Sequence, residues 1–253
     1  MSADPGSKGV ADVQIFDAEP ESPAEQERLN RVLHRTATQP LDIEYPESDG
    51  QPMGENTLQF QWIVTIEGGL EAMFSDNPSV FIAGDLFWYP VEGDPGIRAA
   101  PDIMVVFGRP KGHRRSYLQW KEGNIAPQVV FEIRSPGNRF GEMLKRFSFY
   151  QRYGVEEYYL YDPDFNELEG WLRSGSVLGE IPNMNGWTSP RLGVRFVLEH
   201  DSLTVYRPDG RRLSTYVEVE REREQERQLR LTTEAQLERL RVKLRELGID
   251  PEK

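Results

Sequence analysis

The chain has 253 residues, a net charge of −12 and a hydrophobic fraction of 38%, which is enough for one large domain with appendages. It contains no cysteine, which excludes disulfides, thiolate zinc sites and a cysteine nucleophile and is typical of a protein from a reducing cytoplasm. No apolar run reaches the roughly 20 residues of a membrane span, and the N-terminus lacks the apolar core of a secretion signal.

Three regions follow one another along the chain. Residues 1–44 are rich in Pro, Glu, Asp and Ser, a composition that predicts a mostly disordered acidic leader. Residues 45–216 are predicted to form the main domain, and 217–253 a helical extension. The main domain opens with a predicted helix over 56–74, because apolar residues recur there at every fourth position. These residues are Leu58, Trp62, Ile66, Leu70 and Phe74.

Strands then alternate with a second helix. The predicted strands are 80–91, with a break near Gly84-Asp85, and then 102–108, 128–133 and 156–162, the last expected to pair with 167–173. Segment 138–154 predicts an amphipathic helix with Leu144, Phe147 and Tyr150 on one side. This order of elements predicts an α/β fold with a mixed sheet flanked by helices.

The extension is charged and free of Gly and Pro from about Val217 to Leu247, which predicts one long helix. Near its end, four leucines alternate at spacings of three and four: Leu237, Leu240, Leu244 and Leu247. This spacing is typical of a short coiled-coil seam, so we expect this helix to pack against a second copy and the protein to be a homodimer.

Two acids carry the chemical prediction. Asp102 stands at the start of one predicted strand, and Glu132 stands near the end of a later, apolar one. If these strands are antiparallel neighbours, both carboxylates lie at the same end of the sheet. Two buried acids so close together raise each other's pKa unless a cation lies between them. Oxygen ligands favour Mg²⁺ or Mn²⁺, which predicts a metal site.

A plainer interpretation of the same residues stays open. Asp102 caps a turn in that interpretation, and Glu132 pairs with an arginine, either Arg134 or Arg146. A carboxylate in a buried strand needs some partner, because an unpaired charge is costly to remove from water.

Three stretches resemble a known family. "APDIMVVFG", "APQVVFEIRSPGN" and "KRFSFYQRYGVEEYYLYDP" occur here in the order found in the Uma2 family of restriction-endonuclease-like proteins, and the resemblance extends over about residues 45–250. The most specific stretch is "YGVEEYYLYDP". The family is related to the PD-(D/E)xK nucleases, whose sites combine two acids with a lysine. The resemblance implies a metal-dependent DNA endonuclease in which Asp102 and Glu132 are the metal acids.

The lysine departs from the pattern of that superfamily. The position two residues after Glu132 holds Arg134, which stays protonated and is a poor proton shuttle. The family commonly carries its lysine on the following helix, and the resemblance therefore implies that Lys145 acts in catalysis. Glu55, at the start of the first helix, is a candidate third metal ligand by the same resemblance. As an alternative, Glu55 only favours the helix dipole.

The stretch "RPKGHRR" lies between the two strands that carry the acids. Its cations Arg109, Lys111, Arg114 and Arg115, together with Arg134, are the candidate DNA-binding residues, because such clusters neutralise phosphates. Two rival functions stay open: a noncatalytic scaffold that assembles through the C-terminal helix, and a metal-dependent hydrolase acting on a small phosphate compound.

Overall fold

A computed structural model describes residues 43–47, 56–135 and 140–247. All its helices and strands belong to one compact unit, Tyr45–Lys253; of the preceding unit, Met1–Glu44, only residues 43 and 44 are described. The predicted disorder of the leader therefore concerns residues outside the described ranges.

The centre of the domain is a six-stranded sheet with the order β1-β3-β5-β6-β7-β8. Its strands are β1 (Val80–Gly84), β3 (Ile103–Phe107), β5 (Val129–Ile133), β6 (Glu157–Asp162), β7 (Glu167–Ser174) and β8 (Val177–Glu180). Only β5 and β6 are parallel, and every other neighbouring pair in this sheet is antiparallel. A parallel pair needs a crossover, which the helix between these two strands provides.

Two small sheets accompany the central one. β9 (Arg195–Leu198) pairs antiparallel with β10 (Leu203–Tyr206). β2 (Trp88–Tyr89) pairs parallel with β4 (Tyr117–Leu118), which is followed by a 3-10 turn, η1 (Gln119–Lys121). β2 is the second part of the broken strand predicted over 80–91, whereas β4 lies in a stretch predicted to be only a polar loop.

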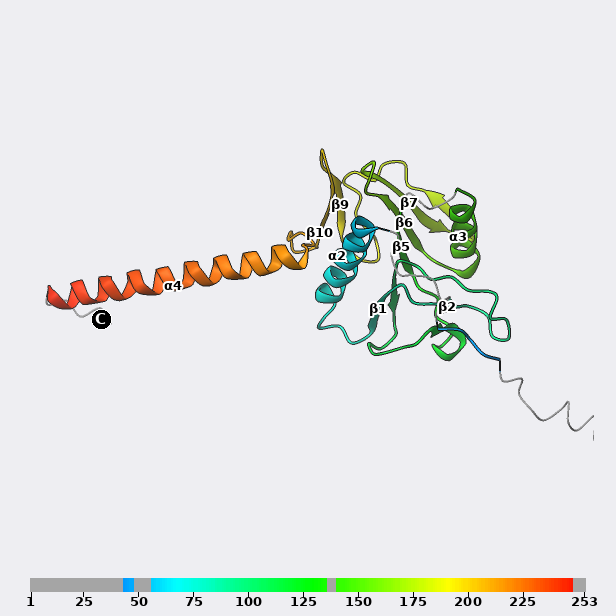
Figure 1. Cartoon of the computed structure of the whole chain (residues 1–253), viewed down its shortest axis with the longest axis horizontal. Coiled ribbons are helices and arrows are strands. Elements are labelled where there is room, and N and C mark those ends of the chain that lie inside the picture. Colours follow the sequence, from blue (N-terminus) through cyan, green and yellow to red (C-terminus); the bar gives the residue numbers. More distant parts are fainter. Residues whose placement is uncertain (1–42, 48–55, 136–139, 248–253) are drawn as a thin grey trace, which may run out of the picture. The chain divides into compact units, whose positions relative to one another are not determined.

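Helices cover both faces of the sheet (Figure 1), which confirms the predicted α/β class. α2 (Thr57–Met73) begins at Asn56, whose side chain accepts a hydrogen bond from the Gln59 backbone N–H. α2 and β9–β10 pack on one face through a core that includes Ile66, Leu70 and Phe196. α3 (Phe140–Tyr153) packs on the other face through Phe147 and Tyr150.

The prediction for the buried side of α3 is partly wrong. Phe147 and Tyr150 face the sheet as expected, but Leu144 is exposed and Met143 packs against the core in its place. A helix turns about 100° per residue, so adjacent positions near the edge of an apolar stripe exchange sides after a small rotation. The rotation of α3 decides which of its cations reaches the sheet.

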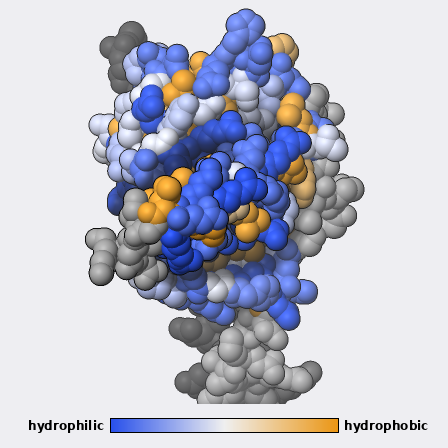
Figure 2. All heavy atoms as spheres, turned by 90° about the vertical axis from the view of Figure 1, so that its left-hand side faces the viewer, coloured by the Kyte–Doolittle hydropathy of each residue, from blue (hydrophilic) through white to orange (hydrophobic). Residues whose placement is uncertain are grey.

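The predicted C-terminal helix is present as α4 (Tyr216–Glu246), and none of its residues is buried. A capping box fixes its start: the Thr215 hydroxyl accepts the Glu218 backbone N–H, and the Glu218 carboxylate accepts the Thr215 backbone N–H. On the face shown in Figure 2, hydrophobic side chains form separate patches among hydrophilic ones. Within the described ranges, no helix combines the length and apolarity needed to cross a membrane.

Candidate active site

The two predicted metal acids lie at one end of the central sheet. β3 and β5 are antiparallel with Ile103 opposite Phe131, so Asp102, just before β3, lies beside Glu132 near the end of β5. The Ile133 backbone N–H donates to Asp102 Oδ2 at 2.7 Å, which holds the aspartate against this strand end. The convergence expected from the strand positions is therefore present, and it depends on the antiparallel pairing.

The carboxyl group of Asp102 has a raised pKa. Burial, followed by the nearby Glu132 carboxylate, raises the pKa of Asp102 to about 8, although the hydrogen bond from Ile133 acts in the opposite direction. Asp85, at the turn after β1, adds to the increase. Its backbone N–H donates to the carbonyl of Asp102 at 3.3 Å. A raised carboxyl pKa in a cluster of acids indicates a site where a cation would be favourable.

Glu132 already has partners on α3. The Tyr150 hydroxyl donates to Glu132 Oε1, and Arg146 Nη1 forms an ion pair with Oε2. Arg146 and Tyr150 are four positions apart, so both point from the same side of α3. Arg146 Nη1 also donates to the Ala100 carbonyl at 3.4 Å. Of the two arginines considered as partners for Glu132, the structure therefore selects Arg146.

The charges in this group reinforce one another. The Glu132 carboxylate raises the pKa of the Arg146 guanidinium above its ordinary value, so Arg146 remains cationic. Burial, followed by the negative charge of Glu132, raises the pKa of Tyr150, so its hydroxyl remains a donor. The Arg146 side chain keeps 41% of its surface exposed, whereas Glu132 keeps 7%. The Arg146 guanidinium thus contacts the buried Glu132 carboxylate while part of the same side chain remains open to solvent.

Arg134 and Lys145, the two candidates for the lysine role, do not contact these acids in the described part of the chain. Arg134 pairs with Asp162 at 3.3 Å and approaches Glu169 at 3.9 Å, toward β6 and β7. Lys145 is exposed on α3, one position before Arg146. Arg146 is the cation at the acids. Glu55 lies outside the described residues.

Three other neighbours of the acids were not singled out from the sequence. Gln59 is buried on α2, and its Nε2 donates to the Ile133 carbonyl at 3.0 Å. Ile133 is thus fixed at its N–H by Asp102 and at its carbonyl by Gln59. Asp85 and Tyr150 are the other two. A polar group on an otherwise apolar helix face could have marked Gln59 and Tyr150 as candidate site residues. The residues that they bind could not be predicted, because these depend on how the helices pack.

The basic loop lies at the opposite end of the sheet from the acids. The acids flank the start of β3, whereas this loop follows the end of β3 at Phe107. The strand has five residues, so the two ends are separated by about 17 Å. Its place in the sequence between the two strands that carry the acids therefore does not put the loop beside the acids, and its predicted contact with DNA stays a prediction. An antiparallel pair brings together the outer ends of two strands and not the loop that joins them.

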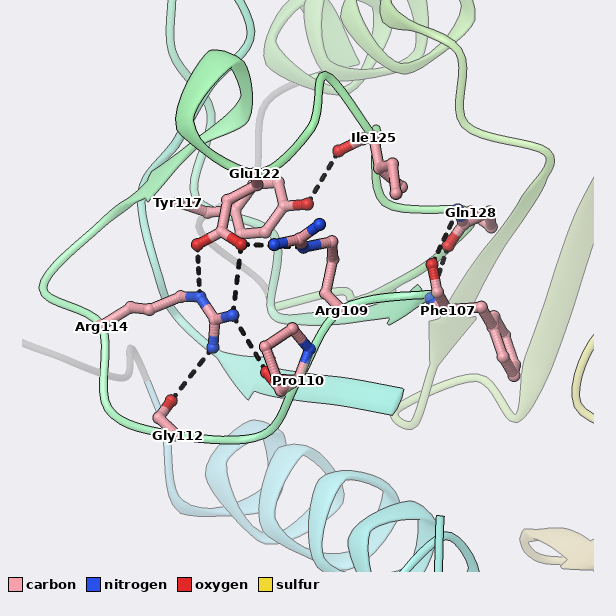
Figure 3. A network of polar contacts seen from close by, with 9 residues as sticks. All are labelled: Phe107, Arg109, Pro110, Gly112, Arg114, Tyr117, Glu122, Ile125 and Gln128. Carbon is pink, nitrogen blue, oxygen red and sulfur yellow. Dashed lines mark hydrogen bonds and ion pairs between the residues drawn. The ribbon is translucent and has the colours of Figure 1, made fainter. Parts of the chain in front are cut away.

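The cations of this loop are also paired with acids. Arg109 and Arg114 both bind Glu122, with Nε–Oε distances of 3.0 and 2.6 Å, in the network shown in Figure 3. The Arg114 guanidinium lies 3.9 Å from the centre of the Phe81 ring, and it donates to the Pro110 carbonyl. These contacts hold the loop together. Because the two arginines share the single carboxylate of Glu122, only part of their charge is neutralised within the protein.

The remaining loop cations are more accessible. Lys111 pairs with Glu71 of α2 at 2.6 Å, and Arg115 pairs with Glu47 at 3.2 Å. The Arg115 side chain keeps 75% of its surface exposed, compared with 12% for Arg114. Among the predicted DNA-binding residues of the loop, Arg115 is therefore the one best able to exchange its partner for a phosphate.

Comparison with known proteins supplies the family. The family model Uma2, described as "Putative restriction endonuclease", matches residues 50–243, which contain both acids and most of α4. The chain belongs to the Uma2 family. A solved structure from Anabaena variabilis ATCC 29413, described as "a putative nuclease belonging to DUF820", is 17% identical, with a TM-score of 0.40 over 58% of this chain and 75% of that one. The search of curated proteins gives no match.

The Uma2 match supports a nuclease-like function. Within the described residues, no group of three or more His, Cys, Asp or Glu side chains is arranged to hold a metal ion. Asp102 and Glu132 are nevertheless two carboxylates at one end of the sheet, the number that Mg²⁺ typically uses besides water and substrate phosphate. The raised pKa of Asp102 fits such a cation, and the ion pair with Arg146 competes with it for Glu132.

Proposed function

We propose that this Uma2 protein is an endonuclease that hydrolyses DNA phosphodiester bonds with Mg²⁺ or Mn²⁺ held by Asp102 and Glu132. One observation supports this function above all: two carboxylates converge at one sheet end, and the pKa of Asp102 is raised to about 8. The superfamily resemblance implies the same pair of acids.

The metal would supply a water of lowered pKa and neutralise charge on the phosphate. The protein's own residues orient the acids. The Ile133 N–H holds one oxygen of Asp102, and Tyr150 holds one oxygen of Glu132. Gln59 fixes the carbonyl of the same residue, Ile133, so the strand end that carries both acids is held from two directions. Such fixed geometry reduces the reorganisation needed for reaction.

We propose that Arg146 binds the scissile phosphate. Its exposed part can donate to a phosphate oxygen, and arginine suits this task because its donors form a planar fork. Lys145, the exposed residue just before Arg146 on α3, is proposed to stabilise charge on the phosphate from the solvent side. Arg134 and the loop cations Arg109, Lys111, Arg114 and Arg115 are proposed as outer contacts to DNA, with Arg115 the most available. Glu55 is proposed as an additional metal ligand.

The test is cleavage of supercoiled, linear and single-stranded DNA by the purified protein with Mg²⁺, with Mn²⁺ and with EDTA. The variants Asp102→Asn and Glu132→Gln should lose metal-dependent cleavage while remaining folded by circular dichroism. Glu180→Gln, which changes an exposed acid at the sheet edge, is the matched control and should cleave like the wild type. Cleavage that persists in Asp102→Asn would show that another site or a contaminant is responsible.

A noncatalytic scaffold is the second candidate, and the Arg146–Glu132 ion pair favours it. In a scaffold this pair, with Tyr150, simply satisfies a buried carboxylate. Calorimetric titration with Mn²⁺ separates the two functions, because a scaffold should bind no metal at Asp102 and Glu132. Wild-type protein that neither binds Mn²⁺ nor cleaves DNA would favour the scaffold.

A further inference from the structure

Several exposed apolar residues of α4 share one heptad register at the two ends of the helix, whereas Val217, Leu229, Leu231 and Val242 lie outside its core positions. The seam formed by Leu237, Leu240, Leu244 and Leu247 occupies positions a and d. Three heptads earlier, Tyr216 and Val219 occupy the same two positions and are 75% and 39% exposed. Between these apolar ends, the a and d positions are polar. They are Arg223, Glu226, Arg230 and Thr233.

We infer that α4 pairs with α4 of a second copy in the antiparallel direction, with the two helices overlapping along their full length. The parallel alternative brings each core position opposite its own copy. It would therefore place Arg223 against Arg223, Glu226 against Glu226 and Arg230 against Arg230. Three successive layers of like charge would oppose that pairing.

The antiparallel direction avoids these contacts through the distribution of charge in the core. An antiparallel pair joins each a position to a d position of the other helix. Both core arginines are at a and the core glutamate is at d, so like charges never share a layer in any antiparallel register. Full overlap places Tyr216 opposite Leu247 and Val219 opposite Leu244, which covers these apolar residues. It also places Arg223 opposite Leu240 and Glu226 opposite Leu237, so the charged ends of these two side chains must reach solvent beside the leucines.

The flanking e positions favour full overlap over a shift by one heptad. Along α4 these positions alternate in sign: Glu220, Arg227, Glu234 and Arg241. In an antiparallel pair the two e rows face each other, and such charges set the orientation and partner choice of coiled coils. Full overlap brings Glu220 near Arg241 and Arg227 near Glu234 of the second copy. A shift by one heptad in either direction brings Glu opposite Glu and Arg opposite Arg.

The ion pairs within each helix leave these charges available. Arg227 lies 3.5 Å from Glu224, and Arg241 lies 3.9 Å from Glu238, all with largely exposed side chains. Exposed pairs of this kind contribute little stability, so exchanging them for contacts between helices costs little. A helix that is mostly polar and carries many ion pairs of this kind can also be stable without a partner helix. A monomer is therefore the main alternative, and the pairing does not depend on the proposed nuclease chemistry.

The absence of cysteine from the full chain allows a direct test. Two single variants, Val219→Cys and Leu244→Cys, are oxidised separately and as a mixture, and products are separated on a non-reducing gel. In the antiparallel pair the two copies of position 219 lie about 25 residues apart along the axis, or about 38 Å. Position 219 of one copy instead lies opposite position 244 of the other, so only the two different variants bring their thiols together. Leu231→Cys, at an outer b position, controls for chance collisions.

We expect a covalent dimer in the mixture, consisting of one copy of each variant, and none from either variant alone or from Leu231→Cys. Covalent dimers from each variant alone would overturn the antiparallel direction. A mixture that cross-links Val219→Cys with Leu237→Cys but not with Leu244→Cys would overturn the full overlap. Wild-type protein that is monomeric by light scattering, with no cross-linking in any sample, would overturn the pairing itself.

Discussion

The two acids at the end of β5 are neutralised to different extents. Arg146 neutralises Glu132, whereas Asp102 receives a backbone N–H and remains an acid with a raised pKa. One further cation between the two acids would therefore stabilise Asp102 more than Glu132. This asymmetry makes the two carboxylates respond differently to substitution.

The first prediction concerns Asp102 and pH in the presence of EDTA. Because the folded pKa is about 8 and the ordinary value is 3.8, the unfolded chain loses this proton at lower pH than the folded protein does. The contribution of Asp102 to stability is therefore full below about pH 4, falls as pH rises, and is lost above pH 8. Asp102→Asn cannot ionise and so avoids the cost of a buried charge at high pH. Between pH 4 and 8, the free energy of unfolding of this variant, relative to the wild type, should rise by up to about 1.4 kcal/mol per pH unit.

Urea denaturation at several pH values from 4 to 9 measures this difference. Asp164→Asn, on the exposed turn after β6, is the control. A constant difference between Asp102→Asn and the wild type over this range would contradict the raised pKa.

The second prediction separates Arg146 from its neighbour Lys145. Arg146→Met leaves Glu132 with Tyr150 and no cation, so the metal-free protein should lose about 2 kcal/mol, the value of a charged hydrogen bond. Its Mn²⁺ affinity should rise, because the competitor for Glu132 is gone, while DNA cleavage falls. Lys145→Ala should change neither stability nor Mn²⁺ affinity. Calorimetric titration with Mn²⁺ and the cleavage assay compare the two variants. Weaker Mn²⁺ binding by Arg146→Met would show that Arg146 does not compete with the metal for Glu132.

At the level of the elements, adjacent glycines in α2 have opposite environments. A Cβ at Gly68 would meet no atom within 4 Å, whereas a Cβ at Gly69 would lie 2.8 Å from Leu213 Cδ2 and 3.1 Å from its Cβ. Glycine inside a helix costs about 1 kcal/mol relative to alanine. Gly68→Ala should therefore stabilise the protein by about 1 kcal/mol, whereas Gly69→Ala should gain less or lose stability. Urea denaturation of both variants compares them, and equal gains would show that Leu213 moves away freely.

The elements themselves were largely predictable because their signals are local. Asn56 caps α2 one residue before its first turn, and the apolar strand segments appear close to their predicted bounds. The convergence of Asp102 and Glu132 followed from the strand ends on the condition that the two strands are antiparallel neighbours, as β3 and β5 are. The partner of Glu132 did not, because the choice between Arg134 and Arg146 depends on the rotation of α3. That rotation is set by tertiary packing, which no local spacing encodes.

At the scale of the whole molecule, the length of α4 determines how the proposed sites could work together. Each helix begins directly after its own domain at Thr215, so an antiparallel pair holds the two domains at opposite ends. The helix has 31 residues, which corresponds to about 46 Å. In the proposed pair, α4 would therefore act as a spacer between the two domains.

This spacing predicts the product of cleavage. Supercoiled plasmid should pass through an open-circular, singly nicked form before any linear form appears, because each site meets one strand independently. A time course on an agarose gel measures the two forms. Linear plasmid formed without an open-circular intermediate would show that two sites act together on one position.

Expressed along the substrate, about 46 Å of helix corresponds to about 14 base pairs of B-DNA at 3.4 Å per step. That is more than one full turn of the duplex, so two sites carried by one pair would face positions separated by well over a turn. Breaks made on opposite strands at such a distance leave the intervening base pairs to hold the ends together. The break pattern would then be paired nicks far apart, which a ligase could reseal, rather than a severed chromosome.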